Sequence, residues 1–311
     1  MKRFLTIIIC LLLMGASIYK LPTITDKISS YFYSTQKVVL TDKNFYAKDA
    51  NYKYVSITDD FVPYNFQELI NIFYTVLDYG YETFTFYCPV EYQDCLDDVN
   101  KISDSNSLDI LTTLGNFVSP FNNFKTLKVQ YDTAGEVTII TERIYSDEDI
   151  RKINAKLDDL WNLLVTSEMD KEDIIYAFHD YFINNTKYDQ AYEEELKTGT
   201  TTHDSSKANG VLFEGYAICS GYTDAMALVL DRLKIPNFKV ASSTHVWNVL
   251  YLNDAWVHLD LTWDDPVDNP NDGGYAKDIL LHKFYLINTE TLEEFDIEDH
   301  TFNKSIYLEL K

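Results

Sequence analysis

Apolar and polar positions along the first half of the chain recur at spacings that predict short strands and helices in turn. Residues 65–77 carry apolar side chains at helical spacing, whereas residues 53–57 and 83–87 have the composition of strands. Residues 93–117 predict further helices, interrupted by the polar run at 103–107. This pattern favours a small α/β unit.

The stretch "TLKVQYDTAGEVTIITERIY" continues this unit as a predicted hairpin. Two alternating runs flank Asp132–Gly135, which supplies turn residues between them. We find no motif with a chemical role in residues 18–145. We therefore predict an N-terminal α/β domain over these residues, without assigning it a function.

A new pattern begins at Ser146, where "SDED" predicts a helix N-cap followed by an acid three residues on. The helix then has a buried stripe of apolar residues: Ile150, Ile153, Leu157, Leu160 and Leu164. A second helix is expected at about residues 171–183. The second predicted domain therefore covers residues 146–311.

The segment "EGYAICSGYTDAMALVL" places Cys219 at or just before the first turn of a helix. Its apolar positions, Ala225, Met226, Val229 and Leu233, recur at helical spacing. Free amide groups and the helix macrodipole favour an anion at such a position, which suits a reactive thiolate. Gly215 and Gly221 leave room for another backbone to approach. A buried structural cysteine is the alternative.

Further along, "STHVWNVLYLNDAWVHLDLTWDDP" predicts a hairpin turning at Asn253–Asp254. A two-residue turn there pairs Tyr251 with Trp256. The same register continues outward to pair Trp247 with Asp260 and His245 with Thr262.

In this register, five side chains project to one face of the hairpin: His245, Trp247, His258, Asp260 and Thr262. His245 and Asp260 become diagonal neighbours with a Cβ separation of about 7 Å or less, within reach of a hydrogen bond. A thiolate, an imidazole and an orienting carboxylate are the groups needed for nucleophilic acyl transfer. We therefore predict Cys219 as nucleophile, His245 as base and then acid, and Asp260 as its orienting partner.

In their order and spacing, "GYAICSGYTDAMALVL", "HVWNV" and "WVHLDLTWDDP" resemble the core motifs of the transglutaminase-like superfamily. The segment "AFHDYFINNTKYD" resembles the helix and Tyr-Asp pair that precede the cysteine in bacterial members. The resemblance covers about residues 147–290, roughly half the chain. Ala217–Ile218 departs from the Gly-Val pair more frequent before the cysteine.

The resemblance implies an α+β fold with a papain-like transglutaminase core. In this core the nucleophile helix packs on an antiparallel sheet that carries the histidine and aspartate. It also implies the Cys219, His245 and Asp260 triad. Three functions fit: a secreted cysteine peptidase or amidase, a crosslinking transglutaminase, or a non-catalytic binding module. Hydrolysis is preferred because the calcium-binding elements and flanking β-domains of vertebrate crosslinking members are not evident in the sequence.

Several residues around the triad have two interpretations. Four aromatic residues could line an acyl-binding groove or belong to the core: Tyr216, Tyr222, Trp247 and Trp263. Tyr188 is a candidate second oxyanion donor beside the Cys219 amide.

No cofactor is expected, and neither of two conceivable metal sites is favoured. A site made of His245, His258 and Asp260 lacks a fourth ligand. In "DDPVDNPNDGG", Pro270 and Ile279 fall where a calcium loop needs ligands, so a polar turn is the better interpretation.

The N-terminus has the layout of a secretory signal over residues 1–17: Lys2 and Arg3, an apolar core, then small residues. An uncleaved membrane anchor is the alternative, and lipidation at Cys10 is not expected. Export would allow Cys88 and Cys95 to form a disulfide, although two free structural cysteines also fit.

The net charge of −23 argues against nucleic-acid partners and against docking on an anionic membrane. The expected partner is a protein or peptide substrate from a host, from the producing cell itself or from cell-wall peptide.

Overall fold

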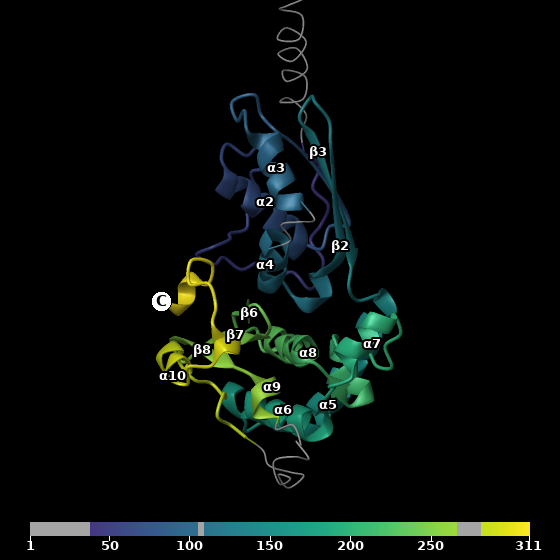
Figure 1. Cartoon of the computed structure of the whole chain (residues 1–311), viewed down its shortest axis with the longest axis vertical. Helices are drawn as coiled ribbons and strands as arrows, with labels where there is room; N and C mark the ends of the chain where they lie inside the picture. The colour runs from purple at the N-terminus through teal and green to yellow at the C-terminus, as the bar shows by residue number, and fades with distance from the viewer. Residues whose placement is uncertain (1–37, 105–108, 266–280) are drawn as a thin grey trace, which may run out of the picture.

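The computed structural model describes residues 38–104, 109–265 and 281–311 (Figure 1). The predicted signal segment 1–17, Cys10, Pro270 and Ile279 lie outside these residues. The fold is a mixed α+β arrangement with antiparallel sheets, as the sequence predicts. Within the described ranges, no helix combines the length and the apolar character needed to cross a membrane.

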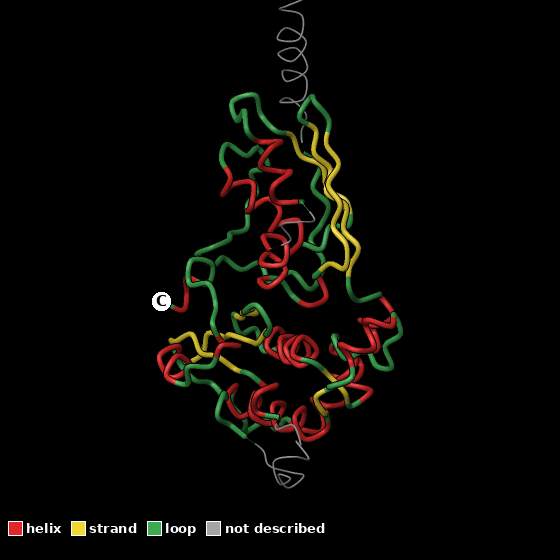
Figure 2. The backbone as a smooth tube through the Cα atoms, viewed as in Figure 1, coloured by secondary structure: helices red, strands yellow, loops and turns green. Residues whose placement is uncertain are grey.

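The first part of the chain contains three helices beside a three-stranded antiparallel sheet (Figures 1 and 2). The helices are α2 (Phe66–Asp78), α3 (Cys95–Ser103) and α4 (Asp109–Phe117). The strands, in the order β1-β3-β2, are β1 (Thr83–Tyr87), β2 (Phe124–Tyr131) and β3 (Glu136–Arg143). The predicted hairpin at Asp132–Gly135 is confirmed, with Asp132 Oδ1 accepting from two backbone amides of the turn.

Residues 53–57 do not form the predicted strand. Three of their amides bind side chains instead: Lys53 donates to Glu309, Ser56 to Asn71 and Ile57 to Asn51. A residue whose amide is bound by a side chain cannot also join a strand ladder. The predicted burial is confirmed, since Val55 lies in the core, but the predicted strand conformation of the backbone is wrong.

The second part carries a helical layer and a further three-stranded antiparallel sheet. The longer helices are α5 (Asp147–Leu164), α6 (Lys171–Asn185), α7 (Tyr192–Thr198) and α8 (Cys219–Arg232). The sheet has the order β6 (Asn237–Ala241), β7 (Val246–Leu252), β8 (Ala255–Leu259). A short parallel pair joins β4 (Lys187–Tyr188) to β5 (Tyr216–Ala217).

Short helices complete the fold: α9 (Leu261–Asp264), α10 (Thr289–Glu294), η1 (Pro120–Asn122), η2 (Gly210–Glu214), η3 (Glu298–His300) and η4 (Leu308–Leu310). The predicted cap of α5 is confirmed: Ser146 and Asp149 bind each other's backbone amides in a capping box.

The sheet β6-β7-β8 separates two apolar cores. Trp247 and Val249 belong to a core shared with α2, α4 and the C-terminal segment. Leu250 and Leu259 belong to a second core shared with α5, α6 and α8. Side chains that alternate along a strand thus bury both faces of this sheet. The boundary between domains at 145/146 stays a prediction, and the N-terminal segment covers the sheet face that bears Trp247.

Cys88 and Cys95 are joined by a disulfide, with their Cα atoms 5.8 Å apart. The bridge links the chain just after β1 to the first residue of α3. Cys219 is the free cysteine of the described residues.

Candidate active site

Cys219 is the first residue of α8 and its side chain is half-buried. The preceding residue, Ile218, has extended backbone and no side-chain oxygen that could cap the helix. Amides of the first turn are therefore left without a side-chain acceptor, and the positive end of the macrodipole adds to them. An anion at the Cys219 sulfur or on a bound substrate is favoured at this place.

The first turn of α8 is held by the loop around Ser205. A Cβ on Gly221 would lie 2.3 Å from the Ser205 carbonyl oxygen, so this approach requires glycine. The same carbonyl accepts the Ile218 amide at 2.9 Å. Asp189, from the Tyr-Asp segment, accepts the Ser205 hydroxyl at 2.5 Å. The segment "KYD" thus fixes the loop that positions Cys219.

The β7–β8 hairpin supplies the histidine and the carboxylate. Asn253 and Asp254 both have positive φ, as a two-residue turn requires, and Tyr251 pairs with Trp256 as predicted. The ladder ends at Asn248–Leu259, so the expected pairs Trp247–Asp260 and His245–Thr262 do not form. The chain leaves the sheet there because Asp260 caps the short helix α9.

His245 and Asp260 are in contact despite the early end of the ladder. His245 Nε2 lies 2.6 Å from Asp260 Oδ2, and both side chains are buried. The other carboxylate oxygen, Oδ1, accepts the backbone amides of Thr262 and Trp263 at 3.0 and 3.3 Å. Backbone donors therefore fix the carboxylate that orients the imidazole.

The Cys219 side chain lies near enough to the His245 ring to affect its pKa. Because Nε2 faces Asp260, the ring offers Nδ1 to the sulfur. Burial alone would lower the pKa of His245, but the Asp260 carboxylate and Cys219 raise it to about 10. An imidazolium at neutral pH donates one N–H to Asp260 and the other to sulfur. The three residues predicted as a triad are thus brought together.

His300 is a fourth member that the sequence analysis missed. Its Nε2 lies 2.8 Å from Asp260 Oδ2, the oxygen that also faces His245. Its Nδ1 is buried and has no hydrogen-bond partner among the described residues. Burial would raise the pKa of Asp260, but His245 and His300 lower it to about 2. No motif surrounds His300, which lies in η3 far along the chain.

His258 lies away from this network. Its Nδ1 accepts from the Trp247 indole at 2.9 Å, so its proton is on Nε2, beside the Thr289 hydroxyl. Burial and the His300 ring lower the pKa of His258 to about 3. A neutral His258 turned toward Trp247 does not complete a metal site with His245 and Asp260.

The aromatic residues singled out in the sequence fall into two groups. Trp247 and Tyr222 are each 1% exposed, Trp247 stacking on the His245 ring and Tyr222 donating to Asp265. Because both side chains are buried, they pack in the core beside the site instead of lining an acyl-binding groove. Trp263 lies edge-on to His245, and Tyr216 is exposed and stacks on His203.

Tyr188 pairs with Ala217 across the parallel strands, two residues before the nucleophile. Contact with a substrate stays a prediction for Tyr188, Tyr216 and Trp263.

Two groups among the described residues bring three potential metal-ligand atoms within 4.8 Å of one another. The first, His245, Asp260 and His300, is better explained as a hydrogen-bond network, because backbone amides and both rings already occupy the Asp260 oxygens. The second, His179, Asp180 and His282, lies outside the candidate active site and is discussed below.

Residues 159–261 match the family model described as the transglutaminase-like superfamily. The chain is similar to a crystal structure of a TGase, with 16% sequence identity and a TM-score of 0.31, over 51% of this chain and 48% of the other. It is also similar to a candidate cysteine protease from Cytophaga hutchinsonii, with 13% identity and a TM-score of 0.27, over 44% of this chain and 61% of the other. The similarity spans less than two thirds of either structure's length. No curated protein matches the chain.

The matched residues include Cys219, His245 and Asp260, whereas His300 lies beyond them. The family match, the motifs in order and the α+β architecture agree. Over residues 159–261, about a third of the chain, the protein is similar to the transglutaminase-like superfamily.

Proposed function

We propose that this chain is a thiol enzyme that hydrolyses amide bonds of protein or peptide substrates through a thioester on Cys219. The observation that carries the proposal is the position of the His245 ring. Its Nε2 lies 2.6 Å from Asp260 Oδ2, and the ring lies near enough to Cys219 for that side chain to help raise the pKa of His245. This arrangement keeps a proton on the imidazole and favours negative charge on sulfur.

In the first half-reaction, the Cys219 sulfur attacks the substrate carbonyl and forms a C–S bond. His245 gives its Nδ1 proton to the leaving nitrogen as the C–N bond breaks, so an amine departs and a thioester remains. Asp260 stays ionised and stabilises the imidazolium, since the pKa of its carboxyl is lowered to about 2. It takes no proton in the cycle.

In the second half-reaction, neutral His245 takes a proton from water while the water oxygen attacks the thioester. The C–S bond breaks, the acid product leaves, and the imidazolium and thiolate are restored. The Cys219 backbone amide at the start of α8 is the proposed oxyanion donor. Tyr188, held beside Ala217, is the proposed second donor.

Transamidation uses the same acyl-enzyme with a lysine amine in place of water. We propose hydrolysis because it needs no second binding site to favour an amine over bulk water. A non-catalytic module is the third possibility, and it would not require Cys219, His245 and Asp260 to be brought together.

The proposed setting is extracytoplasmic. The charged, apolar and small residues of the first 17 positions follow the order of a signal segment. N-terminal sequencing of exported protein tests this proposal. Intact Met1 in a membrane fraction would support an anchor instead.

A peptide library incubated with the protein, with and without a primary amine, tests the reaction. We expect new peptide termini in both mixtures and a mass increase on the Cys219 peptide after rapid quenching. Amine-linked products would indicate transamidation. Equal turnover by wild type and Cys219→Ala would contradict both.

A further inference from the structure

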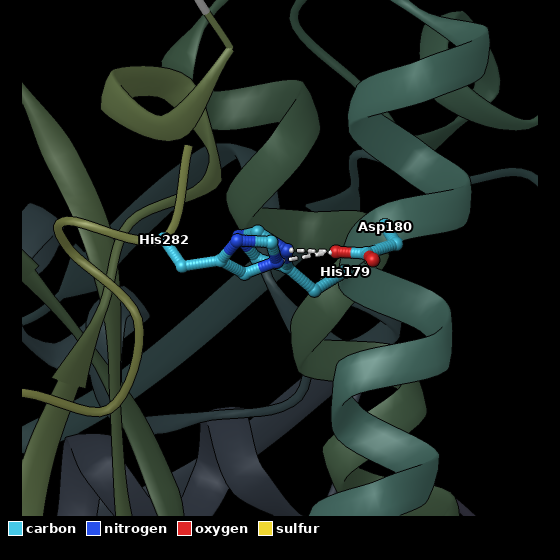
Figure 3. Close-up of side chains that lie close together, drawn as sticks. All are labelled: His179, Asp180 and His282. Atoms are coloured by element: carbon cyan, nitrogen blue, oxygen red, sulfur yellow. Dashed lines mark hydrogen bonds and ion pairs between the residues drawn. The ribbon is translucent and has the colours of Figure 1, made fainter. Parts of the chain in front are cut away.

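A second group of histidine and carboxylate side chains lies beside α6, outside the candidate active site (Figure 3). His179 and Asp180 are neighbours on this helix, and His282 comes from the segment that leads toward α10. Figure 3 shows the His282 ring reaching across to the Asp180 carboxylate, with His179 beside it. Their potential ligand atoms all lie within 4.8 Å of one another.

The spacing of these atoms is close to that of ligands around a small metal ion. Asp180 Oδ1 is 3.1 Å from His179 Nδ1 and 2.7 Å from His282 Nε2. Two ligands at about 2.0–2.1 Å from a tetrahedral ion are about 3.3 Å apart. An ion therefore requires His282 to move back by roughly half an ångström from its present contact.

His179 is the residue whose surroundings point to a cation. Its two ring nitrogens face different carboxylates, Nδ1 that of Asp180 and Nε2 that of Asp264 at 3.2 Å. Both His179 and Asp264 are 0% exposed. A neutral imidazole has one N–H, so one of these nitrogens turns a lone pair toward a carboxylate.

Asp264 is a carboxylate that the backbone holds in place beside the His179 ring. Its other oxygen, Oδ1, accepts the Phe284 amide at 3.0 Å, so this carboxylate serves as an acceptor on both sides. We assign the His179 proton to Nε2, facing this fixed carboxylate, which leaves the Nδ1 lone pair pointing at Asp180. A carboxylate that orients a histidine whose other nitrogen is free is the usual support of a metal-binding histidine.

We propose that His179 Nδ1, Asp180 Oδ1 and His282 Nε2 bind a divalent ion of the zinc type, with Asp264 orienting His179. Two imidazoles and one carboxylate suit zinc better than calcium or magnesium, which prefer all-oxygen sites. Asp180 and His282 are 22% and 29% exposed, so water can reach the fourth position.

The site joins α6 to the segment that supports the candidate active site. Phe284, two residues after His282, gives its amide to Asp264 and accepts the Asp260 amide with its carbonyl at 3.1 Å. Ile287 then pairs with His258 on β8. The ion would tie this segment to α6 and stiffen the backbone that holds Asp260. Its role is structural.

Zinc binding to the full-length Cys219→Ala protein tests the proposal, because this substitution removes the thiol, the sulfur ligand that the candidate active site could offer to zinc. After treatment with a chelator, zinc is titrated in by calorimetry and the melting temperature is measured. We expect one equivalent to bind and the melting temperature to rise by about 5 °C when free zinc is a hundredfold above Kd. Magnesium should give no such rise.

Two variants in the same background locate the ion, and a third is the control. His282→Ala and Asp180→Asn should each weaken zinc binding at least about 100-fold. His203→Ala should bind as the parent does, since His203 stacks on Tyr216 away from the cluster and is 30% exposed, much like His282. Circular dichroism checks that each variant is folded.

Cobalt provides a readout that folding defects do not imitate. Tetrahedral Co²⁺ absorbs strongly in the visible region, and this absorption should appear in the Cys219→Ala protein and disappear in Asp180→Asn. Binding that survives both His282→Ala and Asp180→Asn would place the ion elsewhere and overturn the proposal. Absence of micromolar zinc binding would also overturn it.

Discussion

Two histidine–carboxylate groups lie at opposite ends of α9 and differ in how their carboxylates are satisfied. Asp260, at the start of this helix, receives two backbone amides and faces the His245 and His300 rings, all in a buried setting. Asp264, at its end, faces His179, whose other nitrogen is turned toward the partly exposed Asp180. The same residue types thus have different donors and different access to water.

The difference teaches how such pairs can be distinguished. The Asp260 carboxylate, whose oxygens accept hydrogen bonds from fixed donors, stays ionised. Its charge helps raise the pKa of the buried His245 to about 10. A lone pair turned toward a carboxylate instead leaves room for a cation. The number of N–H donors, rather than the identity of the residues, separates the proposed proton-transfer site from the proposed metal site.

Asp260→Asn should produce the largest loss of activity, because it removes the carboxylate that His245 and His300 share. The amide nitrogen would face the His245 and His300 rings as a donor, so His245 would hold its proton on the wrong nitrogen. We expect kcat/KM for a cleaved peptide to fall about 10⁴-fold. A loss of less than tenfold, measured on folded protein, would contradict the assigned role.

Stability measurements sharpen the comparison between the two carboxylates. In metal-free protein, Asp260→Asn should lower the free energy of unfolding by about 3 kcal/mol, because it leaves buried partners of an ion pair uncompensated. Asp180→Asn should cost about 1 kcal/mol or less, since this side chain is partly exposed. Urea unfolding of both variants measures the difference, and equal losses would show that the two settings are not distinct.

His300 is proposed as a positioning residue for Asp260, and its removal should have a smaller effect. His300→Leu should lower kcat/KM about 10- to 100-fold, the worth of one hydrogen bond to a charged group. His300→Gln can still donate to Asp260 and should recover most of the activity. If Gln and Leu are equally impaired, the ring acts through packing against Phe284 and Trp263 instead.

The smallest expected effect is a trend with pH. The folded-state pKa of His245 lies near 10, above its unfolded value near 6.5, so its contribution to stability is complete below about pH 6.5 and is lost as pH rises through about 10. The stability difference between wild type and His245→Gln should therefore narrow by about 1 kcal/mol from about pH 9 to about pH 10. A constant difference would mean that His245 is neutral in the folded protein.

Much of the candidate site could be predicted because its geometry is local. The Asn253–Asp254 turn fixed the hairpin register, and the period of α8 put Cys219 at a helix start. The early end of the ladder could not be seen, since Asp260 serves both as a partner of His245 and as the cap of α9. That second role depends on backbone amides that have no sequence pattern.

Contacts made across the fold were not predictable from spacing. His300 reaches Asp260 from a short turn with no periodic neighbours, and His282 reaches α6 from a distant segment. The strand predicted at Lys53 does not form for a similar reason: Glu309, near the end of the chain, accepts the Lys53 amide. Local patterns report helices, turns and strand faces, whereas these contacts depend on the packing of remote segments.

The alkylation rate of Cys219 at different pH values tests the central claim most directly, without knowledge of the substrate. With His245 held as an imidazolium beside the sulfur, wild type should react with iodoacetamide at about pH 6 nearly as fast as at about pH 8, and His245→Ala should lose this reactivity at the lower pH. An ordinary thiol would slow by roughly 100-fold over that range. A wild-type rate that falls in this way, or one that His245→Ala leaves unchanged, would contradict the account.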